Sequence, residues 1–275
     1  MGAKLGILAA AGPLPGRLVE ACRQAGRDFV VVAYRGMTDP ALVEGDRVPH
    51  FWTRLGAAGR WIEELKRQEA MTLCPVGNIR RPSLFELMPD FKAVRILTRI
   101  GFSSLGDDAL LTALRRVLQD EGFHLVALHE VIDDFLAKPG LLTRAAPDEM
   151  ALADIAKARE IAREIGRLDI GQGAVVQHGY VLAVEAAEGT DAMLRRCGPL
   201  ARPGPGGVLV KARKPQQDVR LDPPTIGVTT VELAAAAGLR GIVVEAGGAM
   251  VIDAEAVRQA ADRAGLFVLC LAEGE

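Results

Sequence analysis

The chain of 275 residues is longer than one typical domain, which favours two domains. Hydrophobic residues make up 49% of it and charged residues 25%, an ordinary globular composition, and the formal net charge of −2 argues against a nucleic-acid-binding protein with a broad basic face. No apolar run reaches the roughly 20 residues that span a bilayer, and residues 1–11 lack the features of a signal peptide, so we expect a cytoplasmic protein.

The first half of the chain begins with the pattern of strands and helices that is typical of an open nucleotide-binding sheet. Lys4–Ala11 predicts a short buried strand, the apolar-periodic stretch up to Ala25 a helix, and Phe29–Ala33 a second strand. Later in this half, Phe123–Leu128 predicts a closing strand. The order strand, turn, helix, strand therefore predicts an α/β fold with a Rossmann-like open sheet over residues 1–140.

The second half has a different pattern, which predicts a separate domain. Residues 141–165 suggest a linker and a connecting helix that Gly166 ends, and residues 166–275 suggest a C-terminal catalytic domain of mixed α/β type. Two β-rich runs within 174–184 meet at a His-Gly pair, which predicts a β-hairpin. Further on, Thr229-x-x-Glu232 predicts a capping box at the start of a helix.

The four cysteines show no metal-binding or redox spacing. Each lies among apolar neighbours, so we expect buried, reduced thiols rather than disulfides or a zinc site.

A glycine directly after the first predicted strand is the first candidate binding feature. Gly12 would let a phosphate or a sugar approach the backbone N–H groups at the start of the following helix, where Leu14 lies. Ala10 and Pro13 occupy places where further glycines would complete a dinucleotide-binding motif. A plain tight turn therefore stays an alternative.

Polar residues on both sides of the hairpin form the second candidate feature. Because a hairpin folds the chain back on itself, Asp169 and Gln172 before it are expected near the acidic residues after it. The acidic stretch runs from Glu185 to Asp191, and its candidate site residues are Glu188, Gly189, Thr190 and Asp191. The alternative is structural: Thr190 or Asp191 would cap the short helix that follows.

The third feature, residues 211–227, carries the strongest signal in the chain. Lys211 and Lys214 lead into Asp218, Arg220 and Asp222, which alternate so that all three would point to one side of an extended segment. A solvated charge run is the alternative, but the prolines and the glycine of this stretch stiffen it beyond the needs of an idle loop. Cations neutralise a diphosphate, and carboxylates hold magnesium or activate water.

The spacing of the two aspartates limits their roles. In an extended chain Asp218 and Asp222 lie about 13 Å apart, so they cannot ligate one ion unless the chain bends between them. One of them is therefore expected to pair with Arg220 or a lysine, while the other meets metal or water. We favour Asp222 for the chemistry, because Pro223 and the next proline fix its direction.

Long motifs in a fixed order connect these features to a known family. They are G-R-L-D-I-G-Q at 166–172, V-E-A-x-E-G-T-D at 184–191 and K-x-x-K-P-x-Q-D-x-R-x-D-x-P-T-x-G at 211–227. Together with G-I-L-A at 6–9, G-x-L-P at 12–15 and G-D-D-x-L-L at 106–111, they resemble the magnesium-dependent UDP-2,3-diacylglucosamine pyrophosphatases of lipid A biosynthesis, the type unrelated to metallophosphoesterases. The departures are Ala10, where a glycine is usual, and Pro223, where an aliphatic residue is usual.

The resemblance implies hydrolysis of UDP-2,3-diacylglucosamine to UMP and 2,3-diacylglucosamine 1-phosphate (lipid X) by water attacking a phosphorus of the diphosphate. It implies Asp222 as the essential carboxylate, acting on Mg²⁺ or water, with Asp218 as a second metal contact. Lys211, Lys214 and Arg220 would neutralise the phosphates. The substrate-binding positions that it implies are Gly12, Leu14, Asp169, Gln172, Glu188, Gly189, Thr190, Asp191, Gln217, Thr225 and Gly227.

The resemblance also implies a set of partners. The substrate is a membrane-resident nucleotide-sugar lipid, so we expect transient contact with the inner-membrane surface and an aliphatic place for the acyl chains in a cleft between the domains. No nucleic acid is expected, and a homodimer remains open. A non-catalytic nucleotide-sugar-binding regulator and an NAD-dependent oxidoreductase are the alternative functions, the latter disfavoured by the missing glycine motif.

Overall fold

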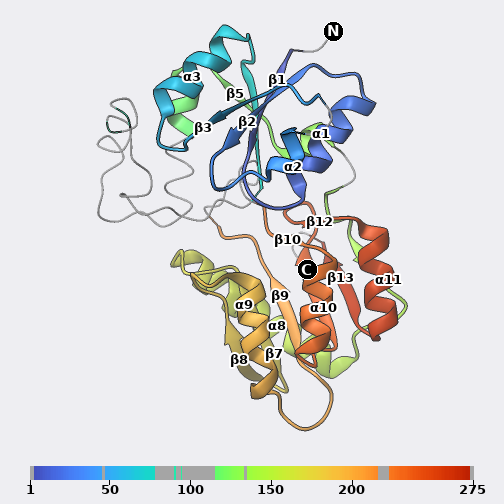
Figure 1. Cartoon of the computed structure of the whole chain (residues 1–275). Coiled ribbons are helices and arrows are strands. Elements are labelled where there is room, and N and C mark those ends of the chain that lie inside the picture. The colour runs from blue at the N-terminus through green and yellow to red at the C-terminus, as the bar shows by residue number, and fades with distance from the viewer. Residues whose placement is uncertain are drawn as a thin grey trace. The chain divides into compact units, whose positions relative to one another are not determined.

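The chain forms two compact units (Figure 1). The computed structural model describes residues 3–44, 47–77, 90, 94, 115–132, 135–215 and 223–272. Unit 1 comprises residues up to 133, and unit 2 comprises the residues from 134 onward. The segment 141–165, which the sequence suggested as a linker and connecting helix, contributes a strand and a long helix to unit 2. None of the described helices is both long and apolar enough to cross a membrane.

Unit 1 is an open sheet of five parallel strands in the order β3-β2-β1-β4-β5. This strand order is that of the Rossmann-type fold predicted from the sequence. Residues 115–120 are also helical. The described elements are β1 (Leu5–Ala9), α1 (Leu14–Gln24), β2 (Phe29–Tyr34), α2 (Pro40–Glu44), β3 (His50–Thr53), α3 (Ala58–Arg67), β4 (Thr72–Val76), β5 (His124–Leu125) and α7 (Leu128–Val131).

The central strands of unit 1 are buried along their whole length. Every residue of β1 and β2 is inaccessible, as near-continuous apolar runs require in a parallel sheet covered on both faces. The predicted closing strand is shorter than 123–128, because the chain turns into α7 at Leu128.

Unit 2 contains a mixed sheet of six strands in the order β6-β13-β11-β9-β7-β8, and a separate pair of strands, β10 and β12. Strands β9, β11 and β13 are parallel, while β6 and the β7–β8 hairpin run antiparallel to their neighbours. The described elements are β6 (Gly140–Leu141), α8 (Glu149–Arg167), β7 (Gly173–Gln177), β8 (Tyr180–Val184), α9 (Gly189–Cys197), the 3₁₀ turn Gly198–Leu200, β9 (Val208–Lys211), β10 (Thr225–Ile226), α10 (Val228–Ala236), β11 (Gly241–Glu245), β12 (Met250–Val251), α11 (Ala254–Ala264) and β13 (Phe267–Leu271).

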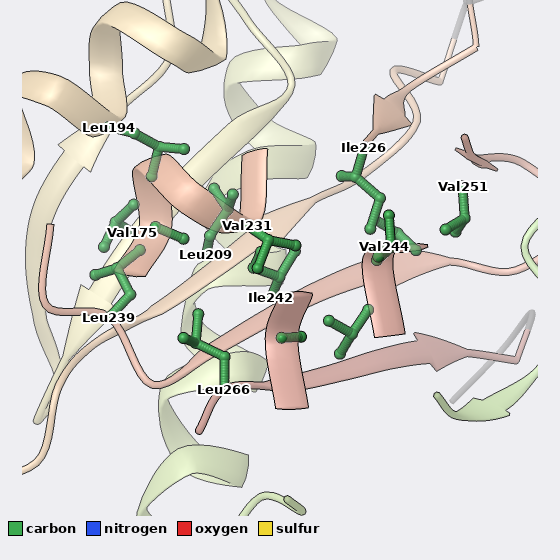
Figure 2. Close-up of a cluster of buried hydrophobic side chains, with 14 of the residues drawn as sticks. Val175, Leu194, Leu209, Ile226, Val231, Leu239, Ile242, Val244, Val251 and Leu266 are labelled. Carbon is green, nitrogen blue, oxygen red and sulfur yellow. The ribbon is translucent and has the colours of Figure 1, made fainter. Parts of the chain in front are cut away.

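The six-stranded sheet separates two hydrophobic cores. On one face, Ala151, Ile155, Ala158 and Ala162 of α8 pack on alternate strand residues such as Val176 and Val210. On the other face, α9, α10 and α11 cover the intervening strand residues, of which Val175, Leu209 and Val244 are labelled in Figure 2. This strict alternation assigns each residue near the strand ends to one face.

The hairpin turn is fixed by a buried carboxylate. His178 and Gly179 both adopt positive φ, 49° and 74°, as a two-residue hairpin turn requires. Asp154 of α8, which is 1% exposed, accepts hydrogen bonds from the backbone N–H groups of His178 and Gly179 at 3.0 and 2.8 Å. The predicted hairpin is thus confirmed, and α8 holds its tip.

Two helix boundaries differ from the sequence prediction. Gly166 does not end α8, which continues to Arg167; instead it lets Lys214 pack closely, since an added Cβ would lie 3.3 Å from the Lys214 Cα. The capping box Thr229-x-x-Glu232 is wrong by two residues. Gly227 begins the helix as its N-cap, and its N–H donates to Thr230 Oγ1 at 3.3 Å.

Candidate active site

The candidate site lies at one edge of the six-stranded sheet of unit 2. Strand β9 ends at Lys211, and the antiparallel β7 begins opposite it, with Gly173 paired to Lys211. Beyond β7, β8 ends at Val184, and the N–H of the next residue, Glu185, donates to the carbonyl of Gly173 at 2.8 Å. Glu185, Gly173 and Lys211 therefore form a row across three neighbouring strands. Such carboxyl ends of parallel strands are where open α/β sheets bind ligands.

Lys211 is a buried cation. Its side chain belongs to the α9–α10 face by alternation from Leu209, and the residue is 5% exposed. Its Nζ donates to the backbone carbonyl of Thr225 at 2.9 Å, which ties the end of β9 to the start of β10. A buried ammonium is costly unless negative charge offsets it, so its position implies an anionic partner.

Lys214, the second buried lysine, has an anionic partner among the described residues. Its Nζ lies 2.7 Å from Asp169 Oδ1, and the side chains are 10% and 20% exposed. Asp169 follows α8 with a positive φ of 56°, and its N–H donates to the carbonyl of Gly166. Asp169, which was predicted near the acidic residues after the hairpin, thus forms an ion pair with the lysine-rich segment.

Glu185 begins the acidic stretch that the sequence singled out, but it was not predicted as a site residue. It is 6% exposed, and its side chain lies across Gly173: a Cβ added there would approach Glu185 Oε2 to 2.5 Å. A Cβ on Gly171 would meet the Glu185 carbonyl oxygen at 2.1 Å. The two glycines of the Gly-Gln-Gly stretch before β7 are thus the signal that could have identified Glu185, because they leave space for it.

Opposing effects act on the pKa of the Glu185 carboxyl. Burial raises the pKa of this group, while the positive charges of Lys211 and Lys214 and a hydrogen bond to the Thr190 side chain oppose the rise. Glu188 adds a small unfavourable charge. Among the described residues, Oε2 of Glu185 has no hydrogen-bond partner. A buried acceptor without a partner costs about 1–3 kcal/mol, which marks the position as special.

The predicted acidic stretch after the hairpin is divided in its roles. Glu188 is the N-cap residue of α9 and forms an ion pair with Arg196 at 2.6 Å, which lowers the pKa of Glu188. Gly189 has a φ of 76° and opens the helix, while Asp191 lies exposed in its first turn. The predicted cap at Thr190 or Asp191 is therefore wrong, because Glu188 occupies the cap position.

Gln172 and Thr225 contribute backbone carbonyls to the hydrogen bonds around the cluster. The carbonyl of Gln172 accepts from Ala212 N–H at 2.9 Å, which extends the β7–β9 ladder past Lys211. The carbonyl of Thr225 accepts from Lys211, and its hydroxyl donates to the carbonyl of Pro223 at 2.9 Å. Thr225 thus links the cluster to the segment that carries the predicted aspartates.

Four predicted site residues lie outside the described residues: Gln217, Asp218, Arg220 and Asp222. They include both predicted magnesium ligands. Within the described parts of the chain, no group of three or more His, Cys, Asp or Glu side chains could hold a metal ion. The segment that bears these residues is bounded by Lys214 and Thr225, which both belong to the cluster.

Gly12 and Leu14 lie in unit 1, at the turn between β1 and α1. Gly12 has a φ of 98°, and a Cβ added to it would meet open space, so the turn leaves the Gly12 backbone accessible. Leu14 is the first residue of α1. The turn follows β1, on whose two sides β2 and β4 lie, the point at which the strand order of the sheet reverses.

The fold and the cluster define the class: a two-unit α/β protein with buried lysines and carboxylates at the ends of its parallel strands. Residues 4–135 match the LpxI N-terminal domain, and residues 138–269 match the LpxI C-terminal domain. The chain belongs to the LpxI family, which confirms the resemblance found in the sequence motifs.

A curated relative extends over nearly the whole chain. The UDP-2,3-diacylglucosamine pyrophosphatase LpxI of Caulobacter vibrioides is 47% identical over 273 residues, which cover 97% of this chain and 96% of that protein. Neither the family matches nor this relative supports an NAD-dependent oxidoreductase or a non-catalytic regulator.

Similarity to solved structures is distant. A precorrin-6A reductase, CobK, aligns with 14% identity and a TM-score of 0.38, covering 100% of this chain and 89% of that one. The biotin carboxylase domain of 2-oxoglutarate carboxylase from Hydrogenobacter thermophilus aligns with 12% identity and a TM-score of 0.26, covering 72% and 41%. At these scores neither similarity carries a functional argument.

Proposed function

We propose that this protein hydrolyses the pyrophosphate of UDP-2,3-diacylglucosamine to lipid X and UMP, in the biosynthesis of lipid A. The observation that carries the proposal is the 47% identity, over 97% of the chain, to a pyrophosphatase of this substrate. The buried lysines at the sheet edge support it independently, because a diphosphate needs fixed positive charge. Lysine side chains held in a water-poor site interact with such charge more strongly than they would in water.

In the proposed reaction, water attacks a phosphorus of the diphosphate while the lysines hold the phosphate oxygens. Lys211 is fixed by Thr225 and Lys214 by Asp169, so both ammonium groups are positioned before substrate binds. Preorganised cations stabilise the charge that develops on the phosphate oxygens and need no rearrangement at the moment of reaction. Arg220 would add a third positive charge, and Asp222 would orient the attacking water.

Magnesium fits this donor chemistry through carboxylates rather than through histidine or cysteine. Asp222 and Asp218 are the residues proposed to hold it, and hard oxygen donors are what this ion prefers. When bound, the ion supplies neutralisation of the diphosphate and activation of water. The roles of Glu188, Gly189, Asp191, Gln217 and Gly227 in holding the substrate are likewise proposals.

The proposed substrate is a lipid, which implies work at a membrane surface. We propose a cytoplasmic protein that touches the inner membrane transiently to collect its substrate. The open backbone of the Gly12 turn would serve the nucleotide or sugar part, since N–H groups at a helix start favour anionic groups.

The test is release of UMP from UDP-2,3-diacylglucosamine in mixed micelles by the purified full chain. We expect UMP with Mg²⁺ and none after chelation with EDTA. Asp222→Ala should abolish turnover, whereas Asp120→Ala, which removes an exposed carboxylate from the helical stretch 115–120, should retain it. An inactive wild type would refute the function, and an active Asp222→Ala variant would refute only the role of Asp222.

A further inference from the structure

In the row formed by Glu185, Gly173 and Lys211, Glu185 and Lys211 lie on either side of Gly173, and the proposed function assigns no role to this arrangement. Residues paired across neighbouring strands lie about 5 Å apart, so the outer members of the row are separated by about 10 Å at their backbones. Between them stands a residue without a side chain. Two long side chains on the same face can therefore approach each other over Gly173, whereas any larger residue there would separate them.

Face assignments agree with this reading. Ala183, Val175 and Leu209 belong to the same core. Glu185 lies two residues after Ala183, Lys211 two residues after Leu209, and Gly173 two residues before Val175, which it precedes in the antiparallel strand β7. Alternation therefore places the Glu185 and Lys211 side chains on the α9–α10 face. The carboxylate acts on the ammonium through space, and Lys211 exerts the largest charge effect on Glu185.

The positive charges of the two buried lysines of the cluster are thus balanced in different ways. Lys214 has a direct ion pair with Asp169 at 2.7 Å. The hydrogen bond of Lys211 to the Thr225 carbonyl carries no full negative charge. Glu185 is the carboxylate across from it; Gly173 leaves room for that carboxylate, and Gly171 for the Glu185 backbone.

We propose that Glu185 is a positioning residue of the active site, which directs the Lys211 ammonium at the diphosphate by balancing its charge across Gly173. This inference rests on the proposed function for the part that concerns the diphosphate. Its electrostatic part concerns the free protein and can be tested without substrate. The unpartnered Oε2 is consistent with a carboxylate placed for its charge rather than for a full set of hydrogen bonds.

The direct test follows the Lys211 side chain by NMR, in the full chain with ¹³C-labelled lysine side chains, with the Lys211 signal assigned from its loss in Lys211→Arg. Glu185→Gln should move the Lys211 signal, because it removes the carboxylate that balances the ammonium across Gly173. The charged groups around the pair are Lys214, Asp169 and Glu188, and all three stay in place in this variant.

Gly173→Ala provides a second variant in which no charge is removed. The added methyl would displace Oε2, the mobile end of a side chain, so folding should be little affected while the carboxylate moves away from its place. Asp154→Asn is the matched control: it removes another buried carboxylate at the hairpin tip, the far end of β7. We expect Gly173→Ala to move the Lys211 signal and Asp154→Asn to leave it unchanged.

Steady-state hydrolysis then tests the link to function. Glu185→Gln should reduce kcat/KM by about tenfold or more, and by less than threefold in a Lys211→Met background. An unchanged Lys211 signal in both Glu185→Gln and Gly173→Ala, or effects of Glu185→Gln and Lys211→Met that multiply fully, would overturn the proposal. A shifted Lys211 signal in a protein that releases no UMP would support the positioning role and refute the function instead.

Discussion

Replacing Asp154 by alanine should destabilise unit 2 without touching the proposed chemistry. The carboxylate accepts two backbone N–H groups of the hairpin turn, at 3.0 and 2.8 Å, and is 1% exposed. Hydrogen bonds to a charged acceptor contribute about 1.5–3 kcal/mol each. Because Gly179 is exposed and its N–H can turn to water, we take the lower end, about 3 kcal/mol in total.

This loss is large enough to measure by thermal unfolding. An unfolding entropy of about 2.1 cal/mol/K per residue gives about 0.3 kcal/mol/K for a unit of about 140 residues, so 3 kcal/mol corresponds to a fall in Tm of about 10 °C. Asp154→Asn keeps one acceptor oxygen and should lose about half as much. The fold and kcat should persist in both variants below the transition.

The control for this prediction is Glu149→Ala, an exposed carboxylate at the start of the same helix, which should change Tm by no more than about 2 °C. A Tm of Asp154→Ala within 2 °C of wild type would show that the turn does not depend on this carboxylate. A large fall in kcat at temperatures where the variant stays folded would show that the hairpin tip acts on the site.

Three further outcomes are expected. Gly171→Ala should unfold unit 2 or lower its Tm by more than about 10 °C, because the new Cβ meets the rigid carbonyl of Glu185 at 2.1 Å; a soluble variant of normal Tm would contradict the packing. Burial raises the pKa of Glu185 above its ordinary 4.5, so the folded protein holds this proton more tightly than the unfolded chain and loses stability as pH rises above 4.5. The urea midpoint of Glu185→Gln relative to wild type should therefore increase from pH 4.5 to 7. A difference that stays constant over this range would refute the reasoning. Because burial raises the pKa of every thiol, a chromogenic disulfide reagent at pH 8 should label none in the folded protein and all four in guanidinium: Cys22, Cys74, Cys197 and Cys270.

The sequence predicted the strands of both units well because their apolar runs are buried on both faces and have few competing interpretations. β1 and β2 appear within a residue or two of the predicted bounds. The hairpin was predictable for a local reason, since His178-Gly179 is a turn pair that tolerates positive φ.

Predictions that depended on a single polar residue were less reliable. Glycine commonly ends a helix, but Gly166 lies inside α8 and leaves room for Lys214, which is 48 positions later in the sequence (214 minus 166). Thr190 resembles a cap in sequence, yet its side chain hydrogen-bonds Glu185. In both cases a tertiary contact overrode the local preference.

Glu185 shows where sequence reasoning reached its limit at the site. The motif that contains it was recognised, but the site residues predicted within that motif were Glu188, Gly189, Thr190 and Asp191. Only the strand register, which pairs Gly173 with Lys211 and extends β8 to Glu185, makes Glu185 the buried carboxylate facing the lysine. The roles of Asp218 and Asp222, outside the described residues, stay predictions.

The cluster is assembled from distant parts of the chain. Lys214 and Asp169 are 45 positions apart in sequence, and Lys211 reaches Thr225 across 14. Contacts of such long range form late during folding, after the closure of the intervening loops has been offset by core packing. A truncated or partly folded chain would therefore not retain a weakened version of this cluster, and binding of a phosphate-bearing ligand could serve as a reporter of complete folding during refolding kinetics.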